Sequence, residues 1–471
     1  MKKILALLAF VGLFTASCSN DDDDAVTGGE TTQSALDKLV ADANIQSETV
    51  SVDSFTVDEM AEVIFGPVSN DENTESARNK FLKQGHEKED SINAVEGTNG
   101  LAIKYYSRKY YYWSHDENNN SIRLSGVIVY AGWDFFGRHY NDANHIILVC
   151  PYTRTCNAEC ASEAMAKEGS YKGISELQLI GCDDLFIVPD GQGFGISSSY
   201  TQPYLNHNLQ AQQLYDGMVA GYDKFRNEVG GEMESDWTLR VVGCSQGGGD
   251  AMAVHKYLDT NNLSGTWRFE YSYPCVGPYD PAATFKKYME DGFSTYPCVF
   301  PMVIKAMRNA FPDFANKYPE ERFFNEKYNT MLKTNMDYHL KVKDLGSADV
   351  CGLFFKSLCT TEKDDNAVEP VYDTTCDYIY LKNFLSEEIL DTTSQMYQDL
   401  MECLEKQNLT TGWTPKTKTY LFCSKNDEIV PYVNSQHAKT FFDTNNVYAD
   451  VATRSYTHTT ACAVWIATKA W

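Results

Sequence analysis

Basic residues are scarce in this chain of 471 residues, which carries 40 Lys and Arg against 65 Asp and Glu. The formal net charge of -25 argues against nucleic acid and anionic membrane surfaces as partners, because both repel an acidic protein. Beyond the N-terminal segment, no apolar run reaches the roughly 20 residues that cross a bilayer. The sequence shows no internal repeat and no Cys-x-x-Cys pair typical of zinc sites. We therefore predict no metal site and no cofactor.

The remaining composition is that of a globular protein. Hydrophobic residues make up 43% of the chain and aromatic residues 13%. The length allows one large domain with an insertion, or two to three small domains.

The N-terminus has the pattern of a targeting segment. Lys2 and Lys3 precede an apolar run, Ile4 to Phe14, and the small residues 15–17 lead directly to Cys18. This order resembles the lipobox of bacterial lipoproteins, in which the cysteine becomes the lipidated first residue. An ordinary signal peptide followed by a chance cysteine is the alternative.

The lipoprotein resemblance implies export and a lipid anchor on the bacterial outer membrane. We predict a signal peptide over 1–17 and an acidic flexible tether over 18–36, with Cys18 as the only membrane attachment. The acidic run of residues 21–24 resembles the surface-export signals of some Gram-negative lipoproteins, which leaves cell-surface exposure open.

A serine lies in a glycine-flanked turn near the middle of the chain. The β-branched run Thr238 to Val242 predicts a buried strand, Gly-Cys-Ser-Gln-Gly follows at 243–247, and helix formers begin at Asp250. Strand, sharp turn and helix in this order resemble the nucleophile elbow of α/β-hydrolases, with Ser245 as the nucleophile. Small residues are needed in this turn because strand and helix approach closely there.

Strand-like and helical segments alternate along the chain, which predicts an α/β fold with a mostly parallel central sheet flanked by helices. A polar turn between the first two strands indicates an antiparallel pair. The expected strands are 101–113, 121–131, 145–150, 185–188, 238–242, 268–273, 419–423 and 447–452.

Two regions fall outside this alternation. Residues 37–100 are polar and are expected to form an N-terminal helical extension. Residues 280–412 hold aromatic-rich helical stretches and are expected to form a helical cap between the two parts of the hydrolase core, 101–279 and 413–471. A separate domain is the alternative, but a further strand and two candidate catalytic residues lie beyond it.

Thirteen cysteines follow Cys18, so an odd number remains for the folded part. The pairs Cys156 with Cys160 and Cys351 with Cys359 are close enough in sequence to be disulfide candidates in an exported protein. Four others at strand ends read as small core residues: Cys150, Cys244, Cys275 and Cys423.

A serine nucleophile needs a histidine as base and a carboxylate that orients the histidine. Asp427 lies in a turn just after the strand 419–423, and His458 follows the last strand. Their order after Ser245 is the Ser, Asp, His order of α/β-hydrolases. Glu428 is the neighbouring carboxylate to exclude.

The oxyanion of an acyl transfer needs two hydrogen-bond donors. The backbone N–H of Gln246 is the first candidate, because it lies at the open start of the elbow helix. The second should come from the loop after Cys150, through the backbone N–H of Tyr152 or Thr153 or through the Tyr152 hydroxyl.

The elbow, the PDGQGFG loop at 189–195, the segment 277–280 and the pair of Asp427 and His458 together resemble the secretory lipase group of α/β-hydrolases. The resemblance covers about 103–471 and implies a carboxylic ester hydrolase with a cap-controlled pocket. It implies substrate contacts at Phe194 and Tyr279, and a small-molecule ester or lipid of short or medium acyl chain as substrate. It departs at Gly191, where a bulky aromatic is expected, and in the oxyanion loop.

Two other classes stay open. A serine peptidase of the prolyl-oligopeptidase kind shares the catalytic fold, but it would need a propeller domain. A catalytically idle binding lipoprotein would have lost a member of the triad.

Overall fold

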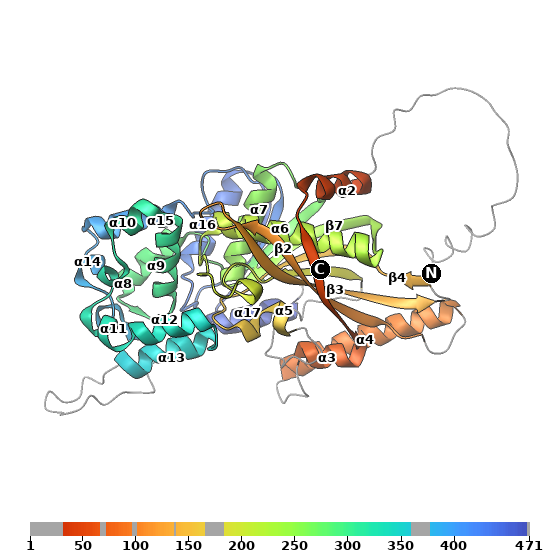
Figure 1. The fold of residues 1–471 in the computed structure, drawn as a ribbon, viewed down its shortest axis with the longest axis horizontal. Coiled ribbons are helices and arrows are strands. Elements are labelled where there is room, and N and C mark those ends of the chain that lie inside the picture. The colour runs from red at the N-terminus through yellow and green to blue at the C-terminus, as the bar shows by residue number, and fades with distance from the viewer. Residues whose placement is uncertain are drawn as a thin grey trace, which may run out of the picture.

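The computed structural model describes residues 32–65, 72–96, 101–135, 138–164, 183–358 and 377–468. These residues are organised around a ten-stranded sheet (Figure 1). Along the sheet the order is β1 (Ser47–Thr56), β2 (Lys104–His115), β3 (Ser121–Phe135), β6 (Asp184–Pro189), β5 (Asp142–Cys150), β7 (Glu232–Cys244), β8 (Phe269–Cys275), β11 (Lys418–Ser424) and β12 (Ala449–Arg454), and β4 (Arg138–Tyr140) pairs with β3.

The sheet is parallel over its second part and antiparallel at its start. Strands β6, β5, β7, β8, β11 and β12 pair in parallel, whereas β1, β2 and β3 pair antiparallel and β3 joins β6 antiparallel. The last five residues of β5 are buried without interruption, as expected for a strand covered on both faces. The predicted α/β fold, with a mostly parallel sheet and a β2–β3 antiparallel pair, is confirmed.

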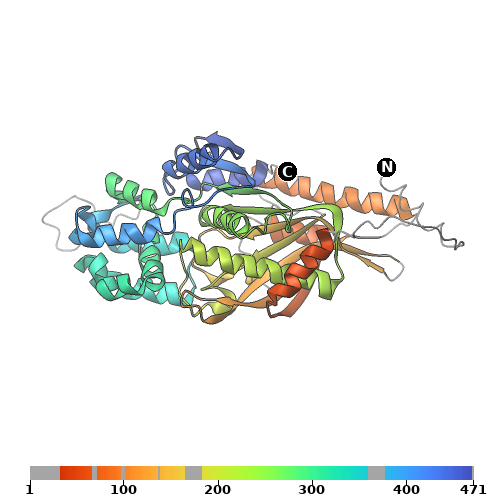
Figure 2. The ribbon, with the colours of Figure 1, turned by 90° about the horizontal axis from the view of Figure 1, so that it is seen from above.

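Helices cover both faces of this sheet (Figure 2). On one face α2, α6, α7 and α16 pack against the sheet residues of one hydrophobic cluster. On the other face α3, α4, α5 and α17 pack against the alternate residues of the same strands. Their bounds are α2 (Thr32–Ala43), α3 (Val57–Phe65), α4 (Glu72–Glu96), α5 (Ala161–Ala164), α6 (His207–Asp223, continued as a π-helix over Lys224–Val229), α7 (Gln246–Thr260), α16 (Val433–Thr444) and α17 (His458–Thr468).

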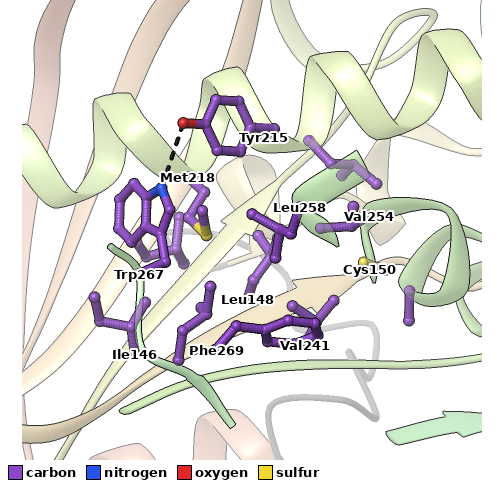
Figure 3. Close-up of a cluster of buried hydrophobic side chains, with 14 of the residues drawn as sticks. Ile146, Leu148, Cys150, Tyr215, Met218, Val241, Val254, Leu258, Trp267 and Phe269 are labelled. Atoms are coloured by element: carbon purple, nitrogen blue, oxygen red, sulfur yellow. Dashed lines mark hydrogen bonds between the residues drawn. The ribbon is translucent and has the colours of Figure 1, made fainter. Parts of the chain in front are cut away.

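The core beneath α6 and α7 holds the elbow strand in place (Figure 3). Leu148 and Val241 are fully buried beside Trp267, whose indole N–H donates to the Tyr215 hydroxyl at 3.3 Å. Burying each such apolar side chain contributes about 1.5–3 kcal/mol. The strand that carries Ser245 is therefore rigidly supported.

The insertion between β8 and β11 is helical and gathers on one side of the sheet (Figure 1). It has its own buried core, which includes Phe300, Tyr328 and Leu400. Its helices are α8 (Pro281–Asp291), α9 (Val299–Ala310), α10 (Pro312–Lys317), α11 (Glu326–Met331), α12 (Lys333–Val342), α13 (Ser347–Leu358), α14 (Glu387–Leu390) and α15 (Gln395–Glu405). A two-stranded antiparallel ribbon, β9 (Phe293–Ser294) with β10 (Ile379–Tyr380), lies within the insertion. Short 3-10 turns occupy Asn157–Glu159, Gly195–Ser197, Glu320–Phe323 and Leu381–Asn383.

The N-terminal region differs from the sequence prediction in two places. The segment expected to be helical contains β1, a ten-residue strand that pairs with β2 at the edge of the sheet. Only one of its ten residues is buried, so its sequence lacks the apolar alternation that identifies a half-buried strand. Helix α2 begins at Thr32, inside the predicted tether, and Leu36 is buried against the core. The signal peptide and Cys18 lie outside the described residues.

All ten cysteines in the described ranges are free thiols. The suggested pairing of Cys156 with Cys160 is therefore wrong, and Cys359 lies outside the described residues. Cys150, Cys244, Cys275 and Cys423 are buried, as predicted for core residues. No helix among the described residues has the length and apolar character needed to cross a membrane.

Candidate active site

Ser245 lies in a strained turn between β7 and α7. Its backbone has φ 57° and ψ -125°, a left-handed conformation that costs a non-glycine residue about 1–3 kcal/mol. The turn is fixed by the Ser245 N–H, which donates to the Cys275 carbonyl on β8 at 2.9 Å. The strain is the expected signature of a nucleophile elbow.

The glycines around the elbow allow backbones to touch. A Cβ atom added at Gly243 would lie 2.2 Å from the Gly247 carbonyl oxygen. At Gly247 it would lie 2.1 Å from the Cys150 carbonyl oxygen, at the end of β5. Any side chain here would push α7 away from the sheet and move Ser245.

Three predicted residues from three elements form one hydrogen-bonded chain. Oγ of Ser245 lies 2.8 Å from Nε2 of His458, the first residue of α17, and Nδ1 of His458 lies 2.7 Å from Oδ2 of Asp427. Asp427 and His458 are almost fully buried. In this arrangement Nδ1 carries its proton toward the carboxylate, so Nε2 is free to accept the serine proton.

The two neighbouring carboxylates have different partners. Oδ1 of Asp427 accepts the backbone N–H groups of Ile429 at 2.9 Å and Val430 at 2.7 Å, which orients its other oxygen toward His458. Oε2 of Glu428 accepts the backbone N–H of His458 at 3.0 Å. Glu428 therefore fixes the start of α17, where helix N–H groups lack partners, and Asp427 alone contacts the imidazole. This positioning contact was not foreseen from the sequence.

Of the two residues predicted for the second oxyanion donor, Thr153 lines the cavity at Ser245 and Tyr152 does not. Thr153 and Gln246 line this cavity together with Ser245. Oγ1 of Thr153 and the Tyr204 hydroxyl lie 3.1 Å apart, which fixes the Thr153 side chain. Tyr152 lines a different cavity.

The Ser245 cavity is mainly apolar and has an empty volume of about 570 Å³. It is formed jointly by loops of the core and by the cap. The individual lining residues could not be predicted from the sequence. Those on α8 and α9 have helical spacing, but nothing in the sequence shows that these helix faces meet the loop after β5 and the loop after β11 at Ser245. The lining comprises Thr153, Tyr204, Leu205, Ser245, Gln246, Pro278, Pro281, Thr284, Phe285, Tyr288, Tyr296, Val299, Phe300, Val303, Leu404, Ile429 and Val430.

Two predicted substrate contacts do not lie at this cavity. Tyr279 is fully buried in the main core, so its side chain is closed off from any substrate. Phe194 is also buried, and its ring lies under the Arg154 guanidinium at 4.8 Å. Both motifs support the structure around the site, and neither side chain lines the Ser245 cavity.

Buried side-chain amides hydrogen-bond to Gln246, the first oxyanion candidate, and to its neighbour Asp250. The Gln202 side chain donates to Oε1 of Gln246 at 3.1 Å, and Gln210 donates to Oδ2 of Asp250 at 3.2 Å. The Gln246 amide in turn points at Asp250. Burial raises the pKa of Asp250 well above its usual range. The network fixes the first turn of α7 and with it the Gln246 N–H.

A second Ser, His, Asp constellation lies inside the core. His255 contacts the Ser272 hydroxyl at 2.8 Å through Nδ1 and Asp259 at 3.1 Å through Nε2. All three residues have an exposed fraction of 0%. No substrate reaches them, so the constellation is a structural hydrogen-bond network between α7, β8 and the start of β11.

Over the ranges that the structure describes, no group of three or more His, Cys, Asp or Glu side chains is arranged to hold a metal ion.

Comparison with known proteins identifies the fold. No family model matches the chain, and no curated protein matches its sequence. A ligand-bound form of LipA, a rice cell wall degrading esterase from Xanthomonas oryzae, matches with a TM-score of 0.60 at 17% identity, over 90% of this chain and 96% of that one. A putative hydrolase from Legionella pneumophila subsp. pneumophila matches with a TM-score of 0.59 at 14% identity, over 89% and 96%. The chain therefore has the α/β-hydrolase fold, and at these identities the likeness extends no further.

Proposed function

We propose that the protein is a serine carboxylic ester hydrolase that acts through an acyl-enzyme. The observation that carries the proposal is the hydrogen-bonded chain from Ser245 through His458 to Asp427, with Ser245 opening into an apolar cavity. An esterase among the proteins of similar fold supports the same reaction class.

The reaction begins when Ser245 Oγ attacks the ester carbonyl carbon while Nε2 of His458 takes the hydroxyl proton. The oxyanion that forms is held by the backbone N–H groups of Gln246 and Thr153. The bond to the alcohol oxygen then breaks, and His458 returns the proton to the departing alkoxide.

Deacylation repeats these steps with water. His458 takes a proton from water, the hydroxide oxygen attacks the acyl carbon, and the bond to Ser245 Oγ breaks. The serine oxygen recovers its proton from His458 and the carboxylic acid leaves. Asp427 orients the imidazole throughout and stabilises the imidazolium.

The substrate is a small-molecule ester or lipid with a short or medium acyl chain. The cap supplies aromatic and aliphatic side chains around the cavity, including Phe285, Phe300 and Val303, which fit an acyl chain. Burial raises the pKa of the Tyr204 and Tyr288 hydroxyls above their usual range, so neither adds a negative charge to the cavity. Membership in the secretory lipase group stays a prediction from the sequence.

The proposal is tested with chromogenic substrates. Wild-type protein should release nitrophenol from p-nitrophenyl acetate, butyrate or octanoate, and Ser245→Ala should abolish the release while the thermal midpoint stays close to that of wild type. Aminoacyl and Gly-Pro nitroanilides should be cleaved more slowly than every ester. Faster cleavage of any nitroanilide that requires Ser245 would favour the peptidase.

For localisation we propose an exported protein that Cys18 attaches to the bacterial outer membrane. The basic residues, apolar run and small residues before Cys18 support this proposal. Mass spectrometry of the protein from cells should find a diacylglyceryl group on Cys18 and no residue before it. An unmodified chain cut elsewhere would contradict the anchor.

A further inference from the structure

A second opening lies at the seam between cap and core. It has an empty volume of about 720 Å³ and is lined on the core side by the loop of Ser199, Tyr200 and Thr201. The cap side is formed by α9, α12 and the residue that follows α12, Lys343. We call this opening the seam groove.

Positive charge gathers in the seam groove, although the chain as a whole carries a net charge of -25. Lys305, Lys341 and Lys343 line it, with Asp337 as the one carboxylate in the lining. Lys305 is paired with that carboxylate, Nζ to Oδ1 at 2.8 Å. Within the described ranges, neither Lys341 nor Lys343 forms an ion pair, so two cations are left for a ligand.

Lys343 is the feature that sets this groove apart from a surface patch of lysines. Its exposed fraction is 5%, yet it is one of the residues that line the groove. Its backbone has φ 59° and ψ 45°, a conformation that favours glycine, and is tied to both sides of the seam. Its N–H donates to the His339 carbonyl of the cap, and its carbonyl accepts from the N–H of Asn157 of the core, each at 2.9 Å.

A buried amine without a carboxylate partner is costly, and an anionic ligand beside Lys343 would offset part of that cost. Burial lowers the pKa of Lys343 to about 8, so the amine is still mostly protonated at pH 7. Its ammonium lies 5.3 Å from the Phe194 ring, a weak cation–π contact. The other charged or titratable groups that influence it are Lys305 on α9 and the Cys160 thiol of the core.

The rest of the lining suits a sugar. Tyr200 presents an exposed aromatic ring, and Ser199 and Thr201 present exposed hydroxyls. Gln202 lines the groove and also donates to Gln246 at the elbow, so the groove and the candidate active site share one hydrogen-bond network. A substrate with one end in the groove would therefore influence the elbow through a single amide.

We propose that the seam groove binds a hydroxylated carboxylate, such as a uronic acid unit, carried on the alcohol side of the ester substrate. Lys343 and Lys341 hold the carboxylate, Tyr200 packs on the sugar ring, and the acyl chain lies in the apolar cavity. The substrate assignment rests on the proposed ester hydrolase. The binding site itself does not.

A direct binding measurement tests the binding site separately from the proposed ester hydrolase activity. We would titrate digalacturonate into the mature chain carrying Ser245→Ala, which removes turnover, and measure the Kd by calorimetry at pH 7. Cellobiose, as a neutral sugar, and inorganic phosphate, as an anion without a sugar, form the other arms. Saturable digalacturonate binding is expected, at least tenfold tighter than for either control ligand.

Three variants locate the site. Lys343→Met should weaken digalacturonate binding at least tenfold, and Lys343→Arg should keep it within about threefold. Lys286→Gln removes a lysine from an exposed position on α8 and serves as the matched control, with Kd unchanged. Lys343→Met alters a buried residue, so this variant could fail to fold. The second measurement therefore uses the protein that keeps Lys343: its digalacturonate binding should weaken at least tenfold from pH 7 to pH 9.5.

Absence of digalacturonate binding, or a pH-independent Kd, would overturn the proposal. Phosphate binding at least as tight as digalacturonate would also overturn the uronate assignment, in favour of a phosphate-bearing ligand. Failure of the ester assays together with Lys343-dependent binding would reject the hydrolase and leave the binding site standing.

Discussion

His207 should make the protein sensitive to mild acid. It begins α6 with an exposed fraction of 0%, and its Nδ1 proton is donated to the Gln407 carbonyl at 2.8 Å. Its Nε2 atom is buried and has no hydrogen-bond partner in the described part of the chain. Protonation would place a charge and an unsatisfied donor in the core. Burial accordingly lowers the pKa of His207 from 6.5 to about 4.

The lowered pKa of His207 determines how stability changes with pH. Because the folded pKa lies below the unfolded pKa, the unfolded chain binds a proton first as the pH falls. The contribution of His207 to stability is complete above pH 6.5 and is lost between pH 6.5 and about 4. The shift of about 2.5 units corresponds to about 3 kcal/mol.

The assay compares urea unfolding of wild type and His207→Gln at pH 7 and pH 4. Glutamine keeps a donor for the Gln407 carbonyl but does not titrate. The difference in unfolding free energy between the two proteins should therefore shrink by about 3 kcal/mol at pH 4.

The stability of wild type alone cannot isolate the effect of His207, because Asp216 titrates in the same pH range. Burial raises its pKa from 3.8 to about 6, so its contribution is present below pH 3.8 and is lost as the pH rises through about 6. This opposes the effect of His207 in wild type but is common to both proteins and cancels. A stability difference that stays constant between pH 7 and pH 4 would refute the reasoning.

Three further predictions concern the site and its support. Asp427→Asn should lower kcat by about 10⁴-fold, and Glu428→Gln by less than tenfold, because only Asp427 contacts the imidazole; steady-state kinetics that reverse the two effects would mean that the acid is misassigned. Val303→Trp should fill part of the acyl cavity and lower kcat/KM for octanoate relative to acetate, and an unchanged profile over chain length would place the acyl chain elsewhere. Asp259→Asn should lower the unfolding free energy by about 1–3 kcal/mol with kcat unchanged, since its carboxylate bonds His255, Ser264, Lys416 and Thr417, none of which lines the Ser245 cavity; calorimetry and ester kinetics on one sample would expose a loss of activity instead.

The parallel strands and the elbow could be predicted from the sequence because their signals are local. β5 reads as an unbroken apolar run, and the glycines at 243 and 247 reflect a contact between neighbouring segments in a fixed motif. Asp427 and His458 follow strands at the same edge of the sheet, so their meeting with Ser245 follows from the strand order.

The features that the sequence did not predict depend on contacts between residues distant in sequence. The edge strand β1 is polar and has a single buried residue, so only its pairing with β2 identifies it. Tyr279 lies in the segment 277–280, whose resemblance to the secretory lipase group implied a substrate contact, but its ring packs into the core. The contact between Glu428 and the His458 N–H spans 30 positions and has no signal in either segment.

Covalent labelling tests the central claim most directly. A fluorophosphonate probe forms a bond only with a serine activated by its base, so the reaction reports on the Ser245, His458 and Asp427 arrangement without knowledge of the substrate. Peptide mapping of the labelled wild-type protein should place the probe on Ser245, and Ser245→Ala and His458→Ala should both remain unlabelled. Labelling at a different serine, or undiminished labelling of His458→Ala, would contradict the account.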